Sequence, residues 1–380
     1  MKRFFVMLVV VSLLILPITS FAKNDVITIN SKAAILIDAS SGKILYEKNA
    51  DQQLAIASIT KVMTLNLIFD AVENGKLDLN EKIMISQNAS GMGGSQAFID
   101  AGYNYTASEL IKSIIIASAN DSAVAMAERV AGSEEAFVHK MNEKAKALGM
   151  NNTVFKNCTG LPESGHLSSA RDVAKMSQEL LKHKDYFTWA TIWMDEINHE
   201  KDGRVTELVN TNKLIRSLNG CNGLKTGYTS EAGFCVTTTA ERDGMRLISV
   251  ILGGNTSKER FKESAELINY GFANYSNQIV LSAGEELGKV EVKNGTEKVL
   301  KAVSIESFSL SINNDGTDKI EKKVILPEKI DAPIKAGQEV GSVIISLNGE
   351  EVKQIKLYSD KDYNKAGFMD KLKEIIVFWK

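Results

Sequence analysis

The hydrophobic and polar positions predict a strand pair followed by a helix at the start of the chain. Two short apolar runs, 33–37 and 44–46, flank a Ser/Gly-rich turn, which is typical of a β-hairpin. From Ser58 onward the apolar residues recur at helical spacing, and Asn74-Gly75 supplies a C-terminal stop signal. We therefore expect a helix that begins at Ser58.

Two more helical stretches follow. Apolar residues at helical spacing cover 107–130 and are interrupted only at 118–121, where Asn120 and Asp121 resemble a turn and cap between two helices. Another helix is predicted from Ser169 to about residue 181, with Asp172 as a partner like that of a capping box.

The pattern then changes to the two-residue period of strands. Segments 233–240 and 246–252 are rich in Val, Ile and Thr and are joined by a turn at 242–245, and 258–275 returns to helix. This order favours an α/β (α+β) domain, with a mixed, mainly antiparallel sheet and helices packed on it, over alternating βα units. We assign this domain to 23–275.

The last hundred residues predict a small β domain and a terminal helix. In 276–358, short Val/Ile-rich segments alternate with Asn-Gly and Asn-Asp-Gly turns, which suits a β-sandwich. In 359–380, one helical face collects Phe368, Leu372, Ile375, Ile376 and Trp379. A helix of about 15 residues rises only about 22 Å and is too short to span a bilayer. We expect an amphipathic helix on a membrane surface; the alternative is a helix docked on the β domain or on a second copy.

The first residues have the features of an export signal. Lys2 and Arg3 precede an apolar run over 4–16, and small residues at 20 and 22 suit a cleavage site. Residues 1–22 are therefore predicted to direct export, which places the protein at the extracytoplasmic face of the membrane or in the cell wall.

Composition excludes several classes of function. The chain has a net charge of −2 and no basic block, so we expect no nucleic-acid partner. With only 4 His, 3 Cys and no pair at metal-ligand spacing, we expect no metal and no cofactor. Cys235 lies in an apolar run and is expected to be a packed thiol, although one pair among the three cysteines remains possible.

A candidate nucleophile lies at the start of the first helix. In Ser58-Ile59-Thr60-Lys61, residues i and i+3 share a helix face, so the Lys61 amine can reach the Ser58 hydroxyl and activate it. The N–H groups of the helix start can stabilise an oxyanion. Alone the motif is weak, because Ser58 would also serve as an ordinary N-cap.

Two further short motifs follow. Ser118-Ala119-Asn120 fits the S-x-N pattern, which occurs elsewhere in the chain, but only this copy joins two apolar helices. Lys225-Thr226-Gly227 occurs once, just ahead of an expected strand, where a lysine places a positive charge and glycine allows a ligand to approach the backbone.

Together and in this order, the three motifs form the set of the penicillin-recognising serine enzymes. The sequence resembles the D-alanyl-D-alanine carboxypeptidases, the low-molecular-mass penicillin-binding proteins. Residues 26–275 resemble them closely, and 276–380 resemble their C-terminal β domain and anchor in kind. Three further stretches carry the likeness: 161–174 (LPESGHLSSARDVA), 225–229 (KTGYT) and 245–260 (MRLISVILGGNTSKER).

The resemblance implies a β-lactamase/transpeptidase-like fold and an acyl-enzyme mechanism. Ser58 would attack the carbonyl between the two terminal D-alanines of a peptidoglycan stem peptide, with neutral Lys61 as its general base. Lys225 and partial burial would lower the pKa of Lys61. Ser118 would pass a proton to the leaving D-alanine, and the N–H groups of Ser58 and Tyr228 would form the oxyanion hole.

The resemblance also implies the substrate-binding residues. Asn120 would bond the amide on the acyl side, and Gly227 completes the K-T-G strand. Lys225, Thr226 and Arg260 would hold the terminal carboxylate. β-Lactams would be covalent inhibitors. Ser169, Arg171 and Asp172 match a family motif near the site, and we expect them to be structural.

Three alternatives use the same residues. A class A-like β-lactamase would need a loop glutamate, for which Glu163 is available, but the surrounding residues match the carboxypeptidase pattern. A D,D-endopeptidase would share the whole site. A non-catalytic penicillin-binding sensor belongs to a different class, and an assay that separates acylation from turnover distinguishes it.

Overall fold

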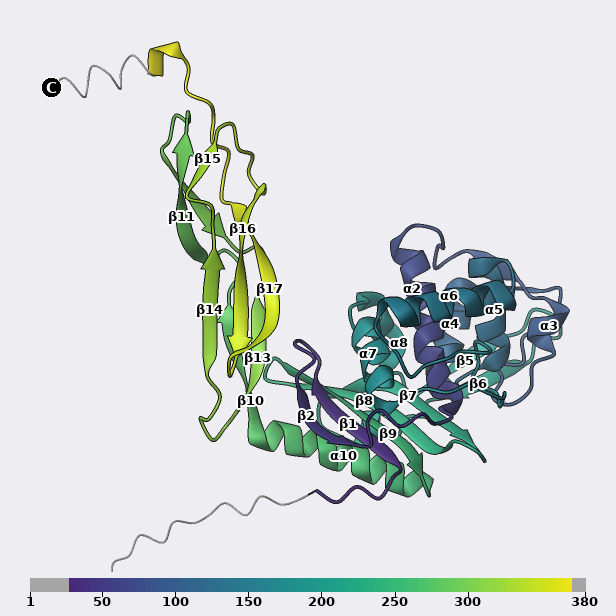
Figure 1. Cartoon of the computed structure of the whole chain (residues 1–380). Coiled ribbons are helices and arrows are strands. Elements are labelled where there is room, and N and C mark those ends of the chain that lie inside the picture. The colour runs from purple at the N-terminus through teal and green to yellow at the C-terminus, as the bar shows by residue number, and fades with distance from the viewer. Residues whose placement is uncertain (1–26, 371–380) are drawn as a thin grey trace, which may run out of the picture.

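A five-stranded antiparallel sheet organises the first domain of the computed structural model, which describes residues 27–370. The strands follow the order β2-β1-β9-β8-β7. Their bounds are Ile44–Lys48, Ala33–Asp38, Met245–Gly254, Gly233–Arg242 and Cys221–Thr229. Every residue of β1 is buried, because helices cover both faces of the sheet (Figure 1). The predicted antiparallel sheet is confirmed, and the export signal predicted at 1–22 lies outside the described residues.

Helices cover the sheet on both sides. α10 (Ser257–Asn274) packs on β8 and β9 from one face, and a block of helices that includes α2 and α7 covers the other (Figure 1). Two small antiparallel strand pairs, β3 with β4 and β5 with β6, border this block: Lys82–Met84 with Asn104–Thr106, and Met194–Asn198 with Val205–Val209. The remaining helices are η1 (Ala57–Thr60), α2 (Lys61–Glu73), α3 (Gln87–Ser90), α4 (Ala107–Ile116), α5 (Asn120–Ala131), α6 (Glu134–Ala147), α7 (Ala170–Leu180), η2 (Lys184–Tyr186), α8 (Phe187–Ala190) and α9 (Leu214–Ser217).

Local signals explain several of these boundaries. The turn between β8 and β9 has Asp243 at φ 49° and Gly244 at φ 75°, the left-handed pair that a two-residue hairpin requires. Ser169 caps α7 by accepting a hydrogen bond from the Asp172 amide at 3.2 Å. The helix expected from Ser58 begins as the 3₁₀ helix η1 and continues as α2.

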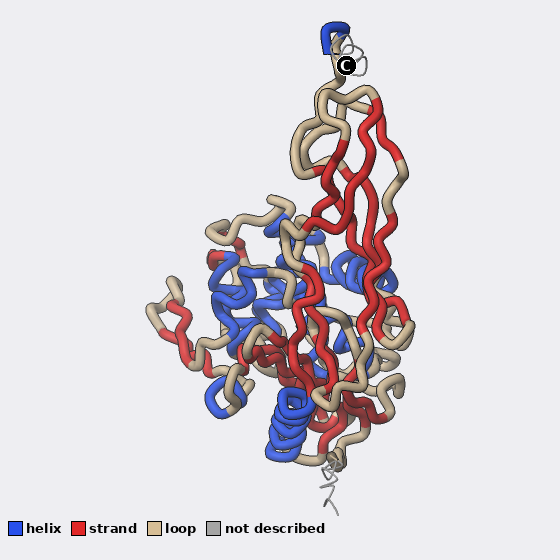
Figure 2. The backbone as a smooth tube through the Cα atoms, turned by 90° about the vertical axis from the view of Figure 1, so that its left-hand side faces the viewer, coloured by secondary structure: helices blue, strands red, loops and turns tan. Residues whose placement is uncertain are grey.

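Residues after α10 form the expected β domain, built from two sheets of unequal size that share one apolar core. β10 (Tyr275–Leu281) pairs with β13 (Phe308–Asn313). The larger sheet has the order β14-β16-β17-β12-β11-β15. Its strands are Ile320–Ile325, Glu339–Leu347, Glu350–Ser359, Val299–Val303, Glu286–Lys293 and Lys329–Asp331. Figure 2 shows these long strands extending away from the helices of the first domain.

A small polar cluster joins the two domains. The Lys43 ammonium lies 2.7 Å from the Asp318 carboxylate and 3.1 Å from the Ser311 carbonyl oxygen. The Ser311 hydroxyl donates to the Asp38 carboxylate at the end of β1. Since Asp318 is almost fully buried, this ion pair fixes the turn after β1 against the β domain.

The end of the described chain differs from the helix expected over 359–380. Residue 359 closes β17, and Tyr363 is buried and forms a bridge with Ile334. Helical residues begin only at Phe368, and 371–380 lie outside the described residues. Within 27–370, no helix is both long enough and apolar enough to cross a bilayer.

Candidate active site

Ser58 and Lys61 lie side by side at the junction of η1 and α2. The Lys61 amine, Nζ, is 3.0 Å from the Ser58 hydroxyl oxygen. Lys61 is fully buried, whereas Ser58 is half-buried and reaches solvent. The geometry predicted from the S-x-x-K spacing is therefore present, although a 3₁₀ turn and not an α-helix carries the serine.

Lys61 is held by two neutral acceptors besides Ser58. Its Nζ donates to the Asn120 side-chain oxygen at 2.6 Å and to the Thr159 carbonyl at 2.7 Å. Burial lowers the pKa of Lys61 from 10.5 to about 7, although Cys158 and Asp121 oppose that shift. A neutral amine can give two protons to Asn120 and Thr159 and keep a lone pair for the Ser58 proton. Full burial, rather than the expected partial burial beside Lys225, is the chief cause of the shift.

The turn between α4 and α5 presents Ser118 and Asn120. Ser118 has φ 65°, a strained conformation for serine, and its buried hydroxyl has no hydrogen-bond partner within residues 27–370. Asn120 is the first residue of α5, and its side-chain nitrogen donates to the Gly93 carbonyl at 2.6 Å. The expectation that Asn120 and Asp121 cap the helix is wrong: Ala119 is the N-cap position, and the Asn120 side chain points to Lys61 instead.

The K-T-G residues lie inside β7, at the edge of the sheet, and not ahead of a strand as expected. Lys225 is buried, and its amine bonds the carbonyl of Thr226 at 3.2 Å. Burial, together with the positive charges of Lys61 and Arg260, holds the pKa of Lys225 well below its usual value. Thr226 donates its hydroxyl to Thr211 at 2.8 Å.

Gly227 lets β7 approach the nucleophile segment closely. A Cβ at this position would lie 2.7 Å from the Ile56 carbonyl oxygen and 3.1 Å from the Ser58 amide nitrogen. The next residue, Tyr228, is exposed and stacks on Phe234 with ring centroids 4.3 Å apart. The Ser58 amide therefore lies beside the main chain that leads into Tyr228.

Arg260 reaches the same strand from α10. One guanidinium nitrogen donates to the carbonyl of Gly227 at 2.8 Å and to that of Cys235 at 3.1 Å. Its Nε is buried and has no hydrogen-bond partner in the part of the chain that the structure describes, and burial lowers the pKa of the guanidinium. Arg260 is thus a buried cation with unused donor capacity, and not an exposed helix residue.

The loop after α6 is a part of the site that the motifs do not indicate. Thr159 supplies the carbonyl that binds Lys61, and Gly160 has φ +83°. A Cβ on Gly160 would lie 1.9 Å from the Ala57 carbonyl oxygen, so only glycine allows this contact. Glu163, the residue that a class A-like β-lactamase would need, is exposed and bonds Asn157 at 3.2 Å.

The remaining predicted residues have structural contacts. The Asp172 carboxylate accepts hydrogen bonds from Asn152 and Thr153, and Arg171 pairs with Asp51 and Glu47 on the surface. The three cysteines are all buried free thiols, as expected for Cys235, and no pair is bridged.

Comparison with known proteins identifies the family to which both domains of this chain are similar. Residues 19–256 match the model of the family described as D-alanyl-D-alanine carboxypeptidase (Peptidase S11), and 275–365 match the penicillin-binding protein 5 C-terminal domain. The chain is 39% identical to D-alanyl-D-alanine carboxypeptidase DacF of Bacillus subtilis, covering 100% of this chain and 99% of that protein. Identity to DacA of Escherichia coli K12 is 33%, over 92% of this chain and 87% of that one.

Solved structures give the same result. A peptidoglycan synthesis regulatory factor (PBP3) from Streptococcus pneumoniae has a TM-score of 0.76 at 28% identity, covering 89% of this chain and 100% of that one. Penicillin-binding protein D2 from Listeria monocytogenes, solved in its cefotaxime-bound form, has a TM-score of 0.58 at 34% identity and covers 65% of this chain and 98% of its own.

Proposed function

This chain belongs to the D-alanyl-D-alanine carboxypeptidase family, and from that premise we propose that Ser58 is the nucleophile that removes the terminal D-alanine from peptidoglycan stem peptides. The chain is a serine D-Ala-D-Ala carboxypeptidase of cell wall remodelling. One observation carries the assignment of the nucleophile: the Ser58 hydroxyl is 3.0 Å from the Lys61 amine, whose pKa lies at about 7. A neutral amine at that distance is a competent general base at neutral pH.

Acylation begins when Lys61 accepts the Ser58 proton and the serine oxygen attacks the carbonyl of the penultimate D-alanine. The negative charge that develops on the carbonyl oxygen is met by the amides of Ser58 and Tyr228. The close approach of β7 at Gly227 supports this oxyanion hole, because it brings the two main chains together.

The leaving amine needs a proton before the C–N bond breaks. Ser118 suits this transfer, because its buried hydroxyl has no competing hydrogen-bond partner. Ser118 would donate its proton to the leaving nitrogen and recover one from the Lys61 ammonium. Free D-alanine departs, Ser58 is left as an ester, and Lys61 is again a neutral base.

Three groups would hold the carboxylate of the substrate. Lys225 and Arg260 are buried cations, and the Arg260 Nε has an unused donor, while Thr226 offers a hydroxyl at the same strand. Asn120 would bond the amide on the acyl side while it orients Lys61. Water then attacks the ester, with Lys61 as base, and restores Ser58. β-Lactams would form the same ester and deacylate slowly.

The place of action follows from the substrate. Peptidoglycan lies outside the cell membrane, so the enzyme would work at the extracytoplasmic face after export by residues 1–22. The apolar residues of the C-terminal sequence, from Phe368 to Trp379, would add contact with the membrane surface.

The test measures D-alanine release by the full-length chain from diacetyl-Lys-D-Ala-D-Ala. We expect release by the wild type and none by Ser58→Ala or after pretreatment with penicillin. Penicillin labelling of Ser58 without release would point to an endopeptidase or a sensor, and rapid penicillin turnover would point to a β-lactamase. Failure of penicillin to label Ser58 would show that the nucleophile is wrongly assigned.

A further inference from the structure

Phe98 is an aromatic residue in a conformation that aromatic residues rarely adopt. It lies in the loop between α3 and β4, has φ 57° and is 55% exposed as a residue. A bulky residue in the left-handed region costs about 1–3 kcal/mol and persists only where its surroundings impose it. Strain that is maintained in order to expose an apolar ring suggests a use for the ring.

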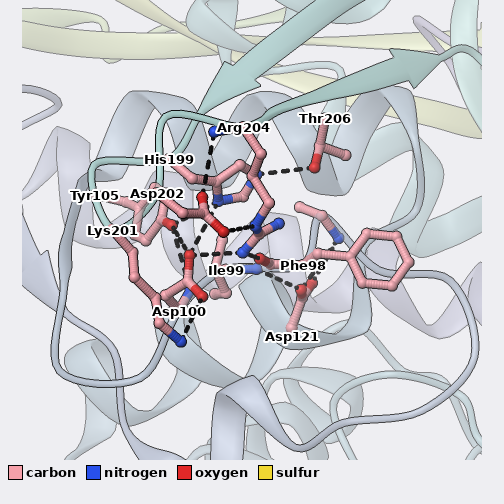
Figure 3. A network of polar contacts seen from close by, with 11 residues as sticks. Phe98, Ile99, Asp100, Tyr105, Asp121, His199, Lys201, Asp202, Arg204 and Thr206 are labelled. Atoms are coloured by element: carbon pink, nitrogen blue, oxygen red, sulfur yellow. Dashed lines mark hydrogen bonds and ion pairs between the residues drawn. The ribbon is translucent and has the colours of Figure 1, made fainter.

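The main chain on both sides of Phe98 is fixed by hydrogen bonds. The Asp121 carboxylate accepts from the amides of Ala97 at 3.1 Å and Ile99 at 3.2 Å. Arg204 donates to the carbonyl of Phe98 at 2.7 Å. Figure 3 shows the result: the polar groups converge on the main chain, and the Phe98 ring points away from them.

Arg204 is itself part of a polar network. It also donates to Asp100 at 2.6 Å, and Asp100 lies 3.4 Å from His199 Nδ1. Tyr105 completes the network through a 2.7 Å bond to His199 (Figure 3). These contacts lock the β5–β6 hairpin to the loop, so the position of Phe98 is set by two separate segments.

The same loop lines the catalytic turn. The Gly93 carbonyl accepts from the Asn120 side chain at 2.6 Å, and the Ser95 carbonyl accepts from the Asn120 amide at 2.7 Å. The loop therefore follows the first residue of α5, Asn120, and the turn before it that carries Ser118. This is the side on which Asn120 would bond the acyl part of the substrate.

We propose that Phe98 is a substrate-binding residue, whose ring packs against the aliphatic side chain of the amino acid that precedes D-Ala-D-Ala. This inference rests on the proposed function, because the loop borders the acyl side only if Asn120 binds there. The chemistry is apolar contact between a fixed ring and a methylene chain, which removes water from both. A ring held in place loses little entropy when the substrate binds.

The test compares two substrates that differ only in this side chain: diacetyl-Lys-D-Ala-D-Ala and acetyl-Gly-D-Ala-D-Ala. The variant is Phe98→Gly in the full chain, because glycine adopts positive φ without strain and the loop keeps its conformation. We expect kcat/KM for the lysyl substrate to fall about tenfold, the effect of losing contact with about two methylenes. The glycyl substrate should change less than about twofold.

Met84→Ala is the matched control, because Met84 is an apolar residue of the same domain that is 71% exposed. It should leave both substrates unaffected. Equal loss for both substrates with Phe98→Gly, or no loss for either, would overturn the proposal. If the wild type releases D-alanine from neither substrate, the proposed function fails instead.

A double-mutant comparison tests the role of Arg204 as a positioning residue. Arg204→Ala should reduce kcat/KM for the lysyl substrate in the wild-type background and cause no further reduction in Phe98→Gly. Additive losses in the double variant would show that Arg204 does not act through Phe98.

Discussion

Lys61 provides the sharpest prediction, because in the proposed mechanism its protonation state would control the first chemical step. Its pKa falls from 10.5 to about 7 through burial. Each unit of pKa corresponds to about 1.4 kcal/mol, so the site disfavours the ammonium by about 5 kcal/mol relative to water. At pH 7 about half of the Lys61 amines would be neutral, against about one in three thousand for an unperturbed lysine.

The perturbation is pH, and the assay is the second-order rate of acylation by a fluorescent penicillin. Since only the neutral amine accepts the Ser58 proton, the rate should rise about tenfold per unit below pH 7 and level off above it. D-alanine release measured as kcat/KM should have the same acidic limb. The label contains no amine that titrates in this range, so the limb reports the enzyme.

A rate that is independent of pH between 5 and 8, or that keeps rising to pH 10, would refute the reasoning. The first result would mean that Lys61 is not the base. The second would mean that the amine keeps the pKa of an exposed lysine in spite of its burial, and that another group activates Ser58.

Three further changes test other parts of the structure. Ser118→Ala should leave the melting temperature unchanged, because its hydroxyl has no partner, but should slow peptide acylation by about 10²–10⁴; an unchanged rate would remove Ser118 from proton transfer. Gly227→Ala should cost about 1–3 kcal/mol of stability and impair acylation, because its Cβ would lie 2.7 Å from a main-chain oxygen. The Cβ of Gly93→Ala would meet open space, so this variant should lose less stability. Urea unfolding compares the two, and equal losses would contradict the close contact. Asp318→Asn tests the domain junction, where Lys43 contributes to lowering the pKa of Asp318 from 3.8 to about 2. Because the pKa is lowered in the folded state, ionised Asp318 stabilises the fold by about 2 kcal/mol above pH 4, and this stability is lost as pH falls toward 2. In a pH series of unfolding curves, Asp318→Asn should lose that acid dependence. A variant that keeps it would show that other groups cause the dependence.

Much of the fold could be predicted, because the hydrophobic pattern is strong in elements that bury a continuous run or a wide face of side chains. The hairpin of β8 and β9 combined continuous apolar strands with an Asp-Gly turn. α6 was missed because only Phe137, Met141 and Ala145 of its fourteen residues are buried, so the apolar stripe is thin. β5 and β6 were missed because most of their residues face solvent.

The three motifs predicted which residues meet at the candidate site, but not the contacts that hold them together. Asn120 resembled a helix cap, because asparagine before a helix often caps it through its side chain. In the structure its side-chain oxygen instead accepts a hydrogen bond from Lys61, which is distant in sequence. The Thr159 carbonyl and the loop at 93–99 gave no signal, since main-chain groups bind without a characteristic side chain. The sequence did not place Lys225 within a strand, because a buried lysine interrupts the apolar pattern of β7.

The buried basic groups of the site give a physical reason for the proposed binding of the substrate's carboxylate. Lys61, Lys225 and Arg260 are buried, and their hydrogen-bond partners are carbonyls, one amide and one hydroxyl, not carboxylates. Burial, and then the positive charges of Lys61 and Arg260, hold the pKa of Lys225 well below its usual value, so the free enzyme disfavours protonation of all three groups at once. A carboxylate that enters beside Lys225 and Arg260 would supply the missing counter-charge. Substrate binding would then also neutralise the buried positive charge. A peptide whose terminal carboxylate is blocked as an amide would bring no negative charge to Lys225 and Arg260 and should bind more weakly.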